Sequence, residues 1–263
     1  MLKNKLEVYY FYLMIDVHCH LEQEDYSENR DKIIEECRKE LRAIITSCAH
    51  PKDFDLTLGL VEKYKGFVFA TVGIHPLYIK EISEQEKENF IKRIKTSKDK
   101  IVGIGEVGLD FFEIREKQWQ EKQKELFIEQ IKLAKDLGLP LIVHSREAYE
   151  EALKILEQEN SKKILLHMFG ANHLVKKVIE NGWYVSTNTI ILKSKTYKKI
   201  VRDMPLDKIM LETDSPWLSP SGGTNTPLSV KIVAEKIAEI KKVELEEVKR
   251  ITTENAVKFF NLF

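Results

Sequence analysis

The sequence has only three cysteines in 263 residues, Cys19, Cys37 and Cys48, and no two of them form a C-x-x-C pair. An odd, widely spaced set argues against a disulfide framework and against a cysteine-ligated zinc ribbon. We therefore expect a protein of a reducing compartment, the cytoplasm.

Long apolar runs and an excess of charge of one sign are also missing. No apolar run approaches the roughly 20 residues of a membrane-spanning helix, so we expect no membrane partner. The 42 lysines and arginines balance 42 aspartates and glutamates, which leaves no net charge. A nucleic-acid partner therefore cannot be predicted from bulk electrostatics, and any attraction to phosphate must be local.

The first residues form a segment of their own. Residues 1–13 contain an aromatic stretch that Glu7 interrupts, and no small-residue cleavage site follows it. This pattern argues against a signal peptide. We expect residues 1–13 to be an N-terminal extension and residues 14–263 to form one domain.

Within that domain, short apolar runs alternate with charged amphipathic segments. Continuous apolar runs are typical of parallel strands that are covered on both faces. Eight alternations favour an α/β fold, the single-domain (β/α)8 TIM barrel, over an open doubly wound sheet. After its first strand the chain also lacks the G-x-G-x-x-G turn that opens dinucleotide-binding sheets. The predicted strands are residues 14–18, 42–48, 67–73, 100–106, 139–144, 162–167, 183–187 and 208–214.

Local signals predict several helix ends. Ser83 and Glu86 form a capping box before a helix that ends near Thr96. Gly138 is expected to close a long helix that begins near Glu113.

Two more helices are predicted toward the C-terminus. Thr226 and Pro227 resemble the N-cap and first position of a helix that leads to Lys242. Residues 244–263 form an amphipathic segment that we expect to pack on the barrel exterior.

Metal-binding and acid–base side chains stand at the C-terminal ends of the predicted strands. In a barrel these ends meet on one face, where the active sites of such enzymes lie. Residues far apart in the sequence then become neighbours. In chain order they are His18, His20, His75, Glu106, His144, His167 and Asp214.

The first strand ends in two histidines separated by one residue. Strand alternation places His18 and His20 on the same side, with Val17 and Cys19 on the other. Two imidazoles at this spacing form half of a site for a divalent ion. The alternative is a pair of histidines whose hydrogen bonds are satisfied at the strand end.

Glu106 lies within a glycine-rich stretch at the end of the fourth strand. One carboxylate can bridge two cations, and the flanking glycines would allow the backbone to approach a metal or substrate. The alternative is a glutamate paired with a core arginine. The stretch lacks the Lys and Ser/Thr of a phosphate-binding loop, so no nucleotide loop is expected here.

The last strand of the barrel ends in two acidic residues. Asp214 is expected to bind metal and accept a proton from an attacking water. Glu212 is a candidate for a carboxylate that orients a ligand histidine by accepting a hydrogen bond from its ring. We interpret Asp16 in the same way, as an acceptor for a ligand imidazole.

Four histidines and two carboxylates form a hard-to-borderline ligand set. The set is His18, His20, Glu106, His144, His167 and Asp214. It suits Zn²⁺, Mn²⁺ or Co²⁺ and, less well, Mg²⁺. Because six ligands exceed the needs of one tetrahedral ion, we expect two divalent metal ions per subunit, bridged by Glu106.

Six motifs in order resemble the TatD-type metal-dependent deoxyribonucleases, a family of TIM barrels in the metal-dependent hydrolase superfamily. The motifs are DVHCH, GIHP, GEVGLD, PLIVHSR, HMFG and LETDSPWL, and the resemblance runs from about Met14 to the C-terminus. It implies metal ligation by the same six residues and a contact between His75 and the substrate phosphate.

The chain departs from the family pattern at two substrate loops. Leu77 and Tyr78 follow GIHP where many relatives carry a histidine or an acid. The loop before Asn225 is Ser-Gly-Gly-Thr, where many relatives carry basic residues. Asn225, in the Asn-x-Pro motif, remains a predicted substrate contact.

The predicted reaction is exonuclease-like hydrolysis of a phosphodiester in DNA, at single strands or ends. Asp214 would hold and deprotonate the water, and His75 and Arg146 would steady the phosphate by charge-assisted hydrogen bonds. No oligomer is predicted.

Three other functions remain open from the sequence. The first is an amidohydrolase or esterase, although such dinuclear relatives often bridge their ions with a modified lysine where this chain has Glu106. The second is a D-aminoacyl-tRNA deacylase within the same family. The third, of another class, is a non-catalytic module that binds metal or nucleic acid.

Overall fold

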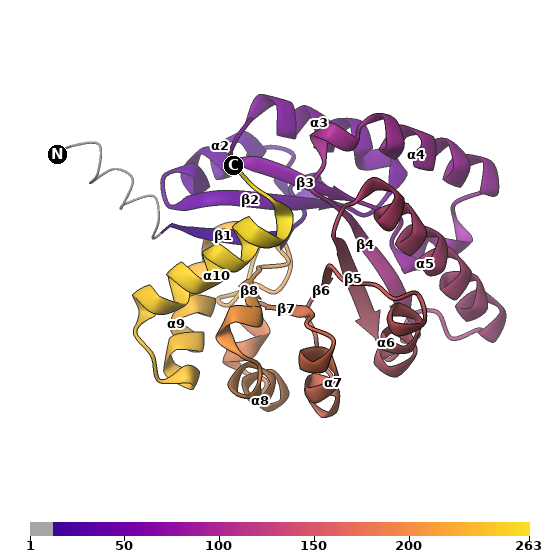
Figure 1. The fold of residues 1–263 in the computed structure, drawn as a ribbon. Coiled ribbons are helices and arrows are strands. Elements are labelled where there is room, and N and C mark those ends of the chain that lie inside the picture. Colours follow the sequence, from indigo (N-terminus) through magenta and orange to yellow (C-terminus); the bar gives the residue numbers. More distant parts are fainter. Residues whose placement is uncertain (1–12) are drawn as a thin grey trace.

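The structure, a computed structural model, describes residues 13–263. Its eight strands form one parallel sheet in the order β1 to β8. The strands curve into a nearly closed barrel with the helices around it, which confirms the predicted (β/α)8 TIM barrel (Figure 1). The strands are β1 (Met14–Cys19), β2 (Leu41–Cys48), β3 (Val68–Val72), β4 (Gly103–Asp110), β5 (Leu141–Arg146), β6 (Ile164–Leu166), β7 (Tyr184–Thr187) and β8 (Ile209–Leu211).

Hydrogen bonds join the chain after β8 to the end of β1. The Asp214 amide donates to the His18 carbonyl at 3.0 Å, and the His20 amide donates to the Ser215 carbonyl at 2.8 Å. These bonds bring the first and last predicted ligand segments together. The predicted extension over residues 1–13 lies, apart from residue 13, outside the described residues.

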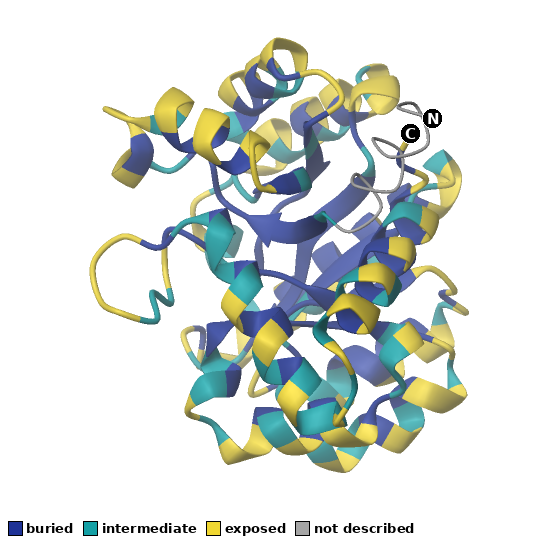
Figure 2. Cartoon of the chain, turned by 90° about the vertical axis from the view of Figure 1, so that its left-hand side faces the viewer, coloured by how far each residue is buried: buried dark blue, intermediate teal, exposed yellow. Residues whose placement is uncertain are grey.

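The strands are buried on both faces, as their continuous apolar runs predict. Figure 2 shows the sheet buried at the centre and the exposed residues on the outer sides of the helices. A larger core cluster fills the space between sheet and helices, and a smaller one fills the barrel. The smaller cluster includes Ile45, Ile142 and Met210 from three strands, with Phe259 and Phe260 from the last helix.

The helices follow the strands in alternation, and the last two close the chain. They are α2 (Arg30–Arg38), α3 (Phe54–Lys63), α4 (Glu84–Thr96), α5 (Lys117–Leu137), α6 (Tyr149–Gln158), α7 (Val175–Glu180), α8 (Lys195–Asp203), α9 (Val230–Lys241) and α10 (Leu245–Phe260). Within residues 13–263, none of them combines the length and the apolar character that crossing a bilayer requires.

The predicted helix ends are confirmed at α4 and at the end of α5. Both bonds of the Ser83–Glu86 capping box are present, and Gly138 ends α5 with a φ of 70°. The predicted start of α5 was wrong, because the helix begins at Lys117 and not near Glu113. The Asp110 carboxylate accepts a hydrogen bond from the Glu113 amide, and this bond holds a turn ahead of the helix.

The helix predicted after Thr226 also begins later. Thr226 precedes the short 3-10 turn η8 (Pro227–Ser229), and its side chain makes no capping hydrogen bond. The α-helix α9 then starts at Val230. The proline thus opens a tighter turn before the helix proper.

Candidate metal centre

The six predicted ligands and His75 converge at the carboxyl end of the barrel. His18, His144 and Glu106 lie in strands, whereas His75, His167 and Asp214 lie just beyond the ends of β3, β6 and β8. The convergence depends on barrel closure, because these segments are far apart in the chain.

His18 and His20 face the same centre, as predicted, but their neighbours do not share the opposite side. Val17 packs in the smaller core cluster and Cys19 in the larger one. The pairing of β1 with β2 shifts register between Asp16 and Cys19, which breaks the regular alternation of side chains.

One oxygen of Glu106 faces the pair of histidines from β1. Glu106 Oε2 lies 3.3 Å from His18 Nε2 and 3.7 Å from His20 Nε2. Asp214 Oδ1 approaches the same two nitrogens, at 3.7 Å from His18 and 3.5 Å from His20. These four side chains form the first half of the centre.

The other oxygen of Glu106 faces imidazoles from the middle of the barrel. Glu106 Oε1 lies 2.9 Å from His144 Nδ1 and 3.6 Å from His167 Nε2. His75 Nε2 approaches the same oxygen at 3.4 Å. The two oxygens of one carboxylate are therefore directed at two groups of histidines.

The glycines of β4 make room for the next strand rather than for a metal. A Cβ on Gly105 would lie 2.6 Å from the Ile142 side chain, and one on Gly108 would lie 2.0 Å from the His144 carbonyl. Gly108 also has a φ of 142°. The expected close approach is therefore between the β4 and β5 backbones.

Carboxylates behind two of the imidazoles fix the direction of their nitrogens. His167 Nδ1 lies 2.7 Å from Glu212 Oε2, as expected for a residue that orients a ligand. His20 Nδ1 lies 3.1 Å from Glu22 Oε1 and 3.1 Å from the Ser47 carbonyl. With these nitrogens donating, Nε2 of each ring presents its lone pair to the centre.

A third carboxylate, Asp110, orients His144. Its Oδ2 lies 3.0 Å from His144 Nε2, so this ring turns Nδ1 toward Glu106. Sequence analysis missed both Asp110 and Glu22. The available signal was their position: Asp110 is the last residue of the GEVGLD motif, and Glu22 stands two residues beyond the end of DVHCH.

Asp16 does not orient an imidazole. Its carboxylate accepts hydrogen bonds from the His18 amide at 3.1 Å and from the Thr213 amide and hydroxyl at 3.1 and 2.5 Å. It therefore ties the end of β1 to the chain after β8, and the interpretation as an outer acceptor for a histidine ring was wrong.

The two central carboxylates remain ionised. Burial alone would raise the pKa of Glu106, but the electrostatic influence of the surrounding imidazoles and the hydrogen bond with His144 hold it well below its ordinary value. Burial likewise opposes ionisation of Asp214, yet hydrogen bonding by His20 and the nearby imidazoles lower its pKa to about 2. The centre thus offers two permanent negative charges to a cation.

The same pairing raises the pKa of two histidines. Burial alone would lower the pKa of His20, but hydrogen bonds to Asp214 and Glu22 raise it well above the ordinary value. At His167, burial is outweighed by the charge of Glu212, and the pKa rises to about 10. Positive charge on these rings balances the buried carboxylates, a role that bound cations would take over.

The donor set fits divalent cations. His18 Nε2 and His20 Nε2 lie 3.2 Å apart, so a shared proton or a cation is needed to keep their two lone pairs from repelling. His18 Nδ1 is buried with no hydrogen-bond partner among the described residues. Three groups have ligand atoms within 4.8 Å of one another, namely His18–His20–Asp214, His18–Glu106–His167 and His75–Glu106–His144.

Five of the six predicted ligands, all but the fully buried His18, line a cavity of about 530 Å³. Arg146 lines it but is exposed, and its guanidinium lies 3.1 Å from Glu113 Oε1 and 3.8 Å from the centre of the Phe112 ring. A phosphate contact by Arg146 would therefore compete with an existing ion pair.

Asn225, the other predicted substrate contact, is buried and does not line this cavity. Its Oδ1 accepts the Thr226 amide at 2.9 Å and the Ser229 hydroxyl at 2.5 Å, and its carbonyl accepts the Tyr26 hydroxyl at 2.6 Å. Through these hydrogen bonds Asn225 holds the loop before α9 in place, so the structure gives no support for a substrate contact.

Comparisons with known proteins place this geometry in a family. The family described as TatD related DNase matches residues 15–261. Deoxyribonuclease TATDN3 of Homo sapiens is 35% identical over 94% of this chain and 94% of the human protein. An uncharacterized metal-dependent hydrolase of Methanocaldococcus jannaschii is also 35% identical, over 94% of this chain and 96% of its own.

Solved structures agree with these sequence matches. The crystal structure of the TatD homolog YJJV from Escherichia coli superimposes with a TM-score of 0.88 at 25% identity, covering 96% of this chain and 100% of that one. A TatD family hydrolase from Entamoeba histolytica shares the fold, with a TM-score of 0.84 at 19% identity over 94% of this chain and 97% of that one. The chain therefore belongs to the TatD related DNase family of metal-dependent hydrolases.

Proposed function

We propose that this protein hydrolyses phosphodiester bonds in DNA with two divalent metal ions bridged by Glu106. The observation that carries the proposal is the orientation of that carboxylate. Its Oε2 faces the histidines of β1 and its Oε1 faces His144 and His167, each within 4 Å. A bridging ligand needs this arrangement, because each oxygen serves one ion.

When bound, two such cations would neutralise charge on the phosphate and make a nearby water more acidic. The histidine-rich set favours Zn²⁺, Mn²⁺ or Co²⁺ over Mg²⁺. His18, His20 and Asp214 would hold one ion, His144 and His167 the other, with Glu106 between them.

Asp214 is the carboxylate that we assign to hold and deprotonate the attacking water. Its side chain is 16% exposed, against 5% for Glu106, so it borders the cavity that substrate and water enter. Its low pKa keeps it ionised and ready to accept a hydrogen bond from water.

His75 is suited to donate a hydrogen bond to the phosphate. Its Nδ1 accepts the Leu77 amide at 3.2 Å, and burial lowers its pKa. The neutral ring then carries its proton on Nε2, the nitrogen that faces the centre. This tautomer supports a phosphate contact rather than metal ligation. Arg146, from the rim, would add charge if it leaves Glu113.

A substrate panel tests the proposal. Purified protein supplied with Mn²⁺ or Zn²⁺ is assayed on single-stranded DNA, on small esters and amides, and on D-aminoacyl-tRNA, while bound metal is counted by mass spectrometry. We expect turnover of DNA and two ions per chain. Turnover of amides or of D-aminoacyl-tRNA alone would replace the proposed reaction, and metal binding without any turnover would indicate a binding module.

A further inference from the structure

The rim of the metal-centre cavity carries a large exposed aromatic side chain. Trp217 is 46% exposed, and among the described residues it is the only exposed large hydrophobic side chain that lines this cavity. Its ring centre lies 4.9 Å from that of His20. A flat apolar surface therefore stands directly beside the candidate ligands.

The backbone around Trp217 is held on both sides. The Trp217 amide donates to the Asp214 carbonyl at 3.1 Å, and the carbonyl of Pro216 accepts the Asn225 amide at 2.8 Å. The next carbonyl, of Leu218, accepts the Thr189 hydroxyl. Because the segment is already ordered, presenting the indole to a ligand costs little conformational entropy.

Outside the metal centre, positively charged side chains are scarce around the same cavity. Among the described residues that line it, Arg146 is the only lysine or arginine, and it is paired with Glu113. The strand order places the end of β5, with Arg146, across the barrel from Trp217 after β8. Beyond the phosphate held at the metal centre, a nucleic-acid chain therefore finds a single cation that is already paired, and the neighbouring nucleotides must gain their binding energy from another source.

We propose that Trp217 is a substrate-positioning residue whose indole stacks on the nucleobase next to the scissile phosphate. Stacking on an aromatic side chain tolerates any base and stabilises single strands without phosphate charge. A base within a duplex is stacked and paired already, so the site selects an unpaired nucleotide. This inference rests on the proposed function, since it assigns the substrate's base to the same cavity.

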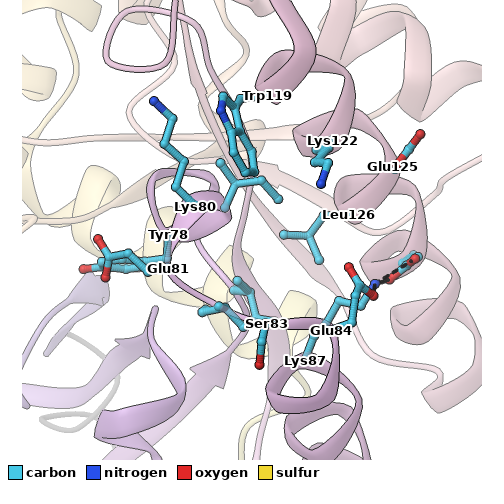
Figure 3. Close-up of a pocket in the computed structure, with 14 residues that line it drawn as sticks. Tyr78, Lys80, Glu81, Ser83, Glu84, Lys87, Trp119, Lys122, Glu125 and Leu126 are labelled. Atoms are coloured by element: carbon cyan, nitrogen blue, oxygen red, sulfur yellow. Dashed lines mark hydrogen bonds and ion pairs between the residues drawn. The ribbon is translucent and has the colours of Figure 1, made fainter. Parts of the chain in front are cut away.

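A second cavity, of about 390 Å³, also carries a tryptophan but is unsuited to a nucleic acid. It lies between α4 and α5, shares Tyr78 with the first, and contains Trp119 (Figure 3). Three lysines also line it: Lys80 and Lys87 are paired with carboxylates, and Lys122 lies over the Trp119 ring. The acidic residues of its lining, which would repel a polyanion, are Glu81, Glu84, Glu125 and Glu129. Trp119 is therefore a matched control for Trp217.

Calorimetric binding to the Mn²⁺-loaded protein tests the proposal. The probe is a cleavage-resistant phosphorothioate thymidine trinucleotide, and its abasic counterpart is the reference. We expect Trp217→Ala to weaken binding of the thymidine trimer about 5- to 150-fold, the range for losing one stacked base. Trp217→Phe should lose less affinity for the thymidine trimer, and Trp119→Ala should leave that affinity unchanged. The abasic trimer should bind wild type and Trp217→Ala equally.

Salt dependence and kinetics give independent readouts. With about one phosphate neutralised, the slope of log K against log salt should be near −0.7. Trp217→Ala should raise KM for single-stranded DNA while kcat changes little. Equal loss of affinity for the abasic and thymidine trimers would overturn the stacking role, as would a slope of about −1.4, which indicates that both phosphates of the trimer are neutralised.

The two proposals fail separately. If the protein cleaves DNA but Trp217→Ala binds the thymidine trimer as wild type does, stacking is wrong and phosphodiester hydrolysis stands. If wild type cleaves no DNA but binds the trimer in a base- and Trp217-dependent way, the reaction is wrong and the base site stands.

Discussion

The residues of this site form two groups: ligand side chains that face the centre, and residues that orient those side chains by hydrogen bonds. His20, His144 and His167 each have one ring nitrogen toward Glu106 or Asp214 and the other on a carboxylate or carbonyl. A carboxylate behind an imidazole fixes its tautomer and increases its basicity. Substitutions in the two groups should therefore differ in degree.

The bridging role of Glu106 predicts the most severe loss. Glu106→Ala should reduce metal-dependent hydrolysis to background and lower the metal content below two ions per chain. Among the described residues, Glu106 is the carboxylate that directs one oxygen to each group of histidines, whereas Asp214 approaches His18, His20 and His167 with a single oxygen. Circular dichroism should show a retained barrel. The exposed Glu113→Ala is the control and should keep both ions. Full activity of Glu106→Ala with two ions bound would contradict bridging.

The orienting role of Asp110 predicts a smaller loss. Asp110→Asn preserves size and an oxygen that accepts the Glu113 amide, but it removes the negative charge beside His144. Metal affinity or activity should fall about 10- to 100-fold, as is typical for partners of ligand histidines. Titration with a chelator of known affinity measures this. An unchanged affinity would show that the Asp110–His144 contact does not support ligation.

At the level of elements, strands β4 and β5 bring their backbones unusually close at the site. Gly108 faces the His144 carbonyl without room for a Cβ. The helices show the opposite case, since a Cβ on Gly59, within α3, would meet nothing within 4 Å. Substitution of glycine by alanine should therefore lower the stability of the protein at Gly108 in β4 and keep or raise it at Gly59 in α3.

Gly108→Ala should destabilise the protein and disturb His144. Overpacking costs about 1–3 kcal/mol in the free energy of unfolding, which corresponds to roughly 2–12 °C in Tm for a chain of this size. Gly59→Ala should leave Tm unchanged or raise it, because alanine favours the helix by about 0.5–1 kcal/mol. Calorimetry compares the two, and an equal Tm for both variants would contradict the close strand contact.

On the scale of the whole molecule, the metal centre joins the first and last strands of the barrel. Its ligands come from β1 and from the segment after β8, as well as from β4 to β6. Buried carboxylates and imidazoles from distant parts of the chain cluster there. Bound cations should therefore stabilise the closed barrel as well as take part in the reaction.

Removing metal with EDTA should lower Tm and abolish hydrolysis together. Excess metal at about 100 times Kd stabilises the folded state by about 2.7 kcal/mol, or roughly 5–11 °C in Tm. Scanning calorimetry with and without EDTA, followed by added Mn²⁺ or Zn²⁺, measures the difference. Loss of activity without any change in Tm would indicate that the ions do not bridge the strands.

The sequence by itself determined the barrel and the side chains of its centre. Apolar runs predicted the parallel strands, and His, Glu and Asp at the run ends predicted the convergence around Glu106. These features are readable because burial and strand direction are local properties of the chain. The resemblance of the ligand motifs to one family added the expected reaction.

Only the tertiary structure decided which polar groups support the ligands. Asp110 and Glu22 orient histidines, Asp16 ties β1 to the last loop, and Asn225 holds its own loop instead of substrate. The glycines of β4 serve the contact with β5. A hydrogen bond or a backbone contact between distant segments depends on strand register and side-chain rotamers, and these exist only once the barrel has closed.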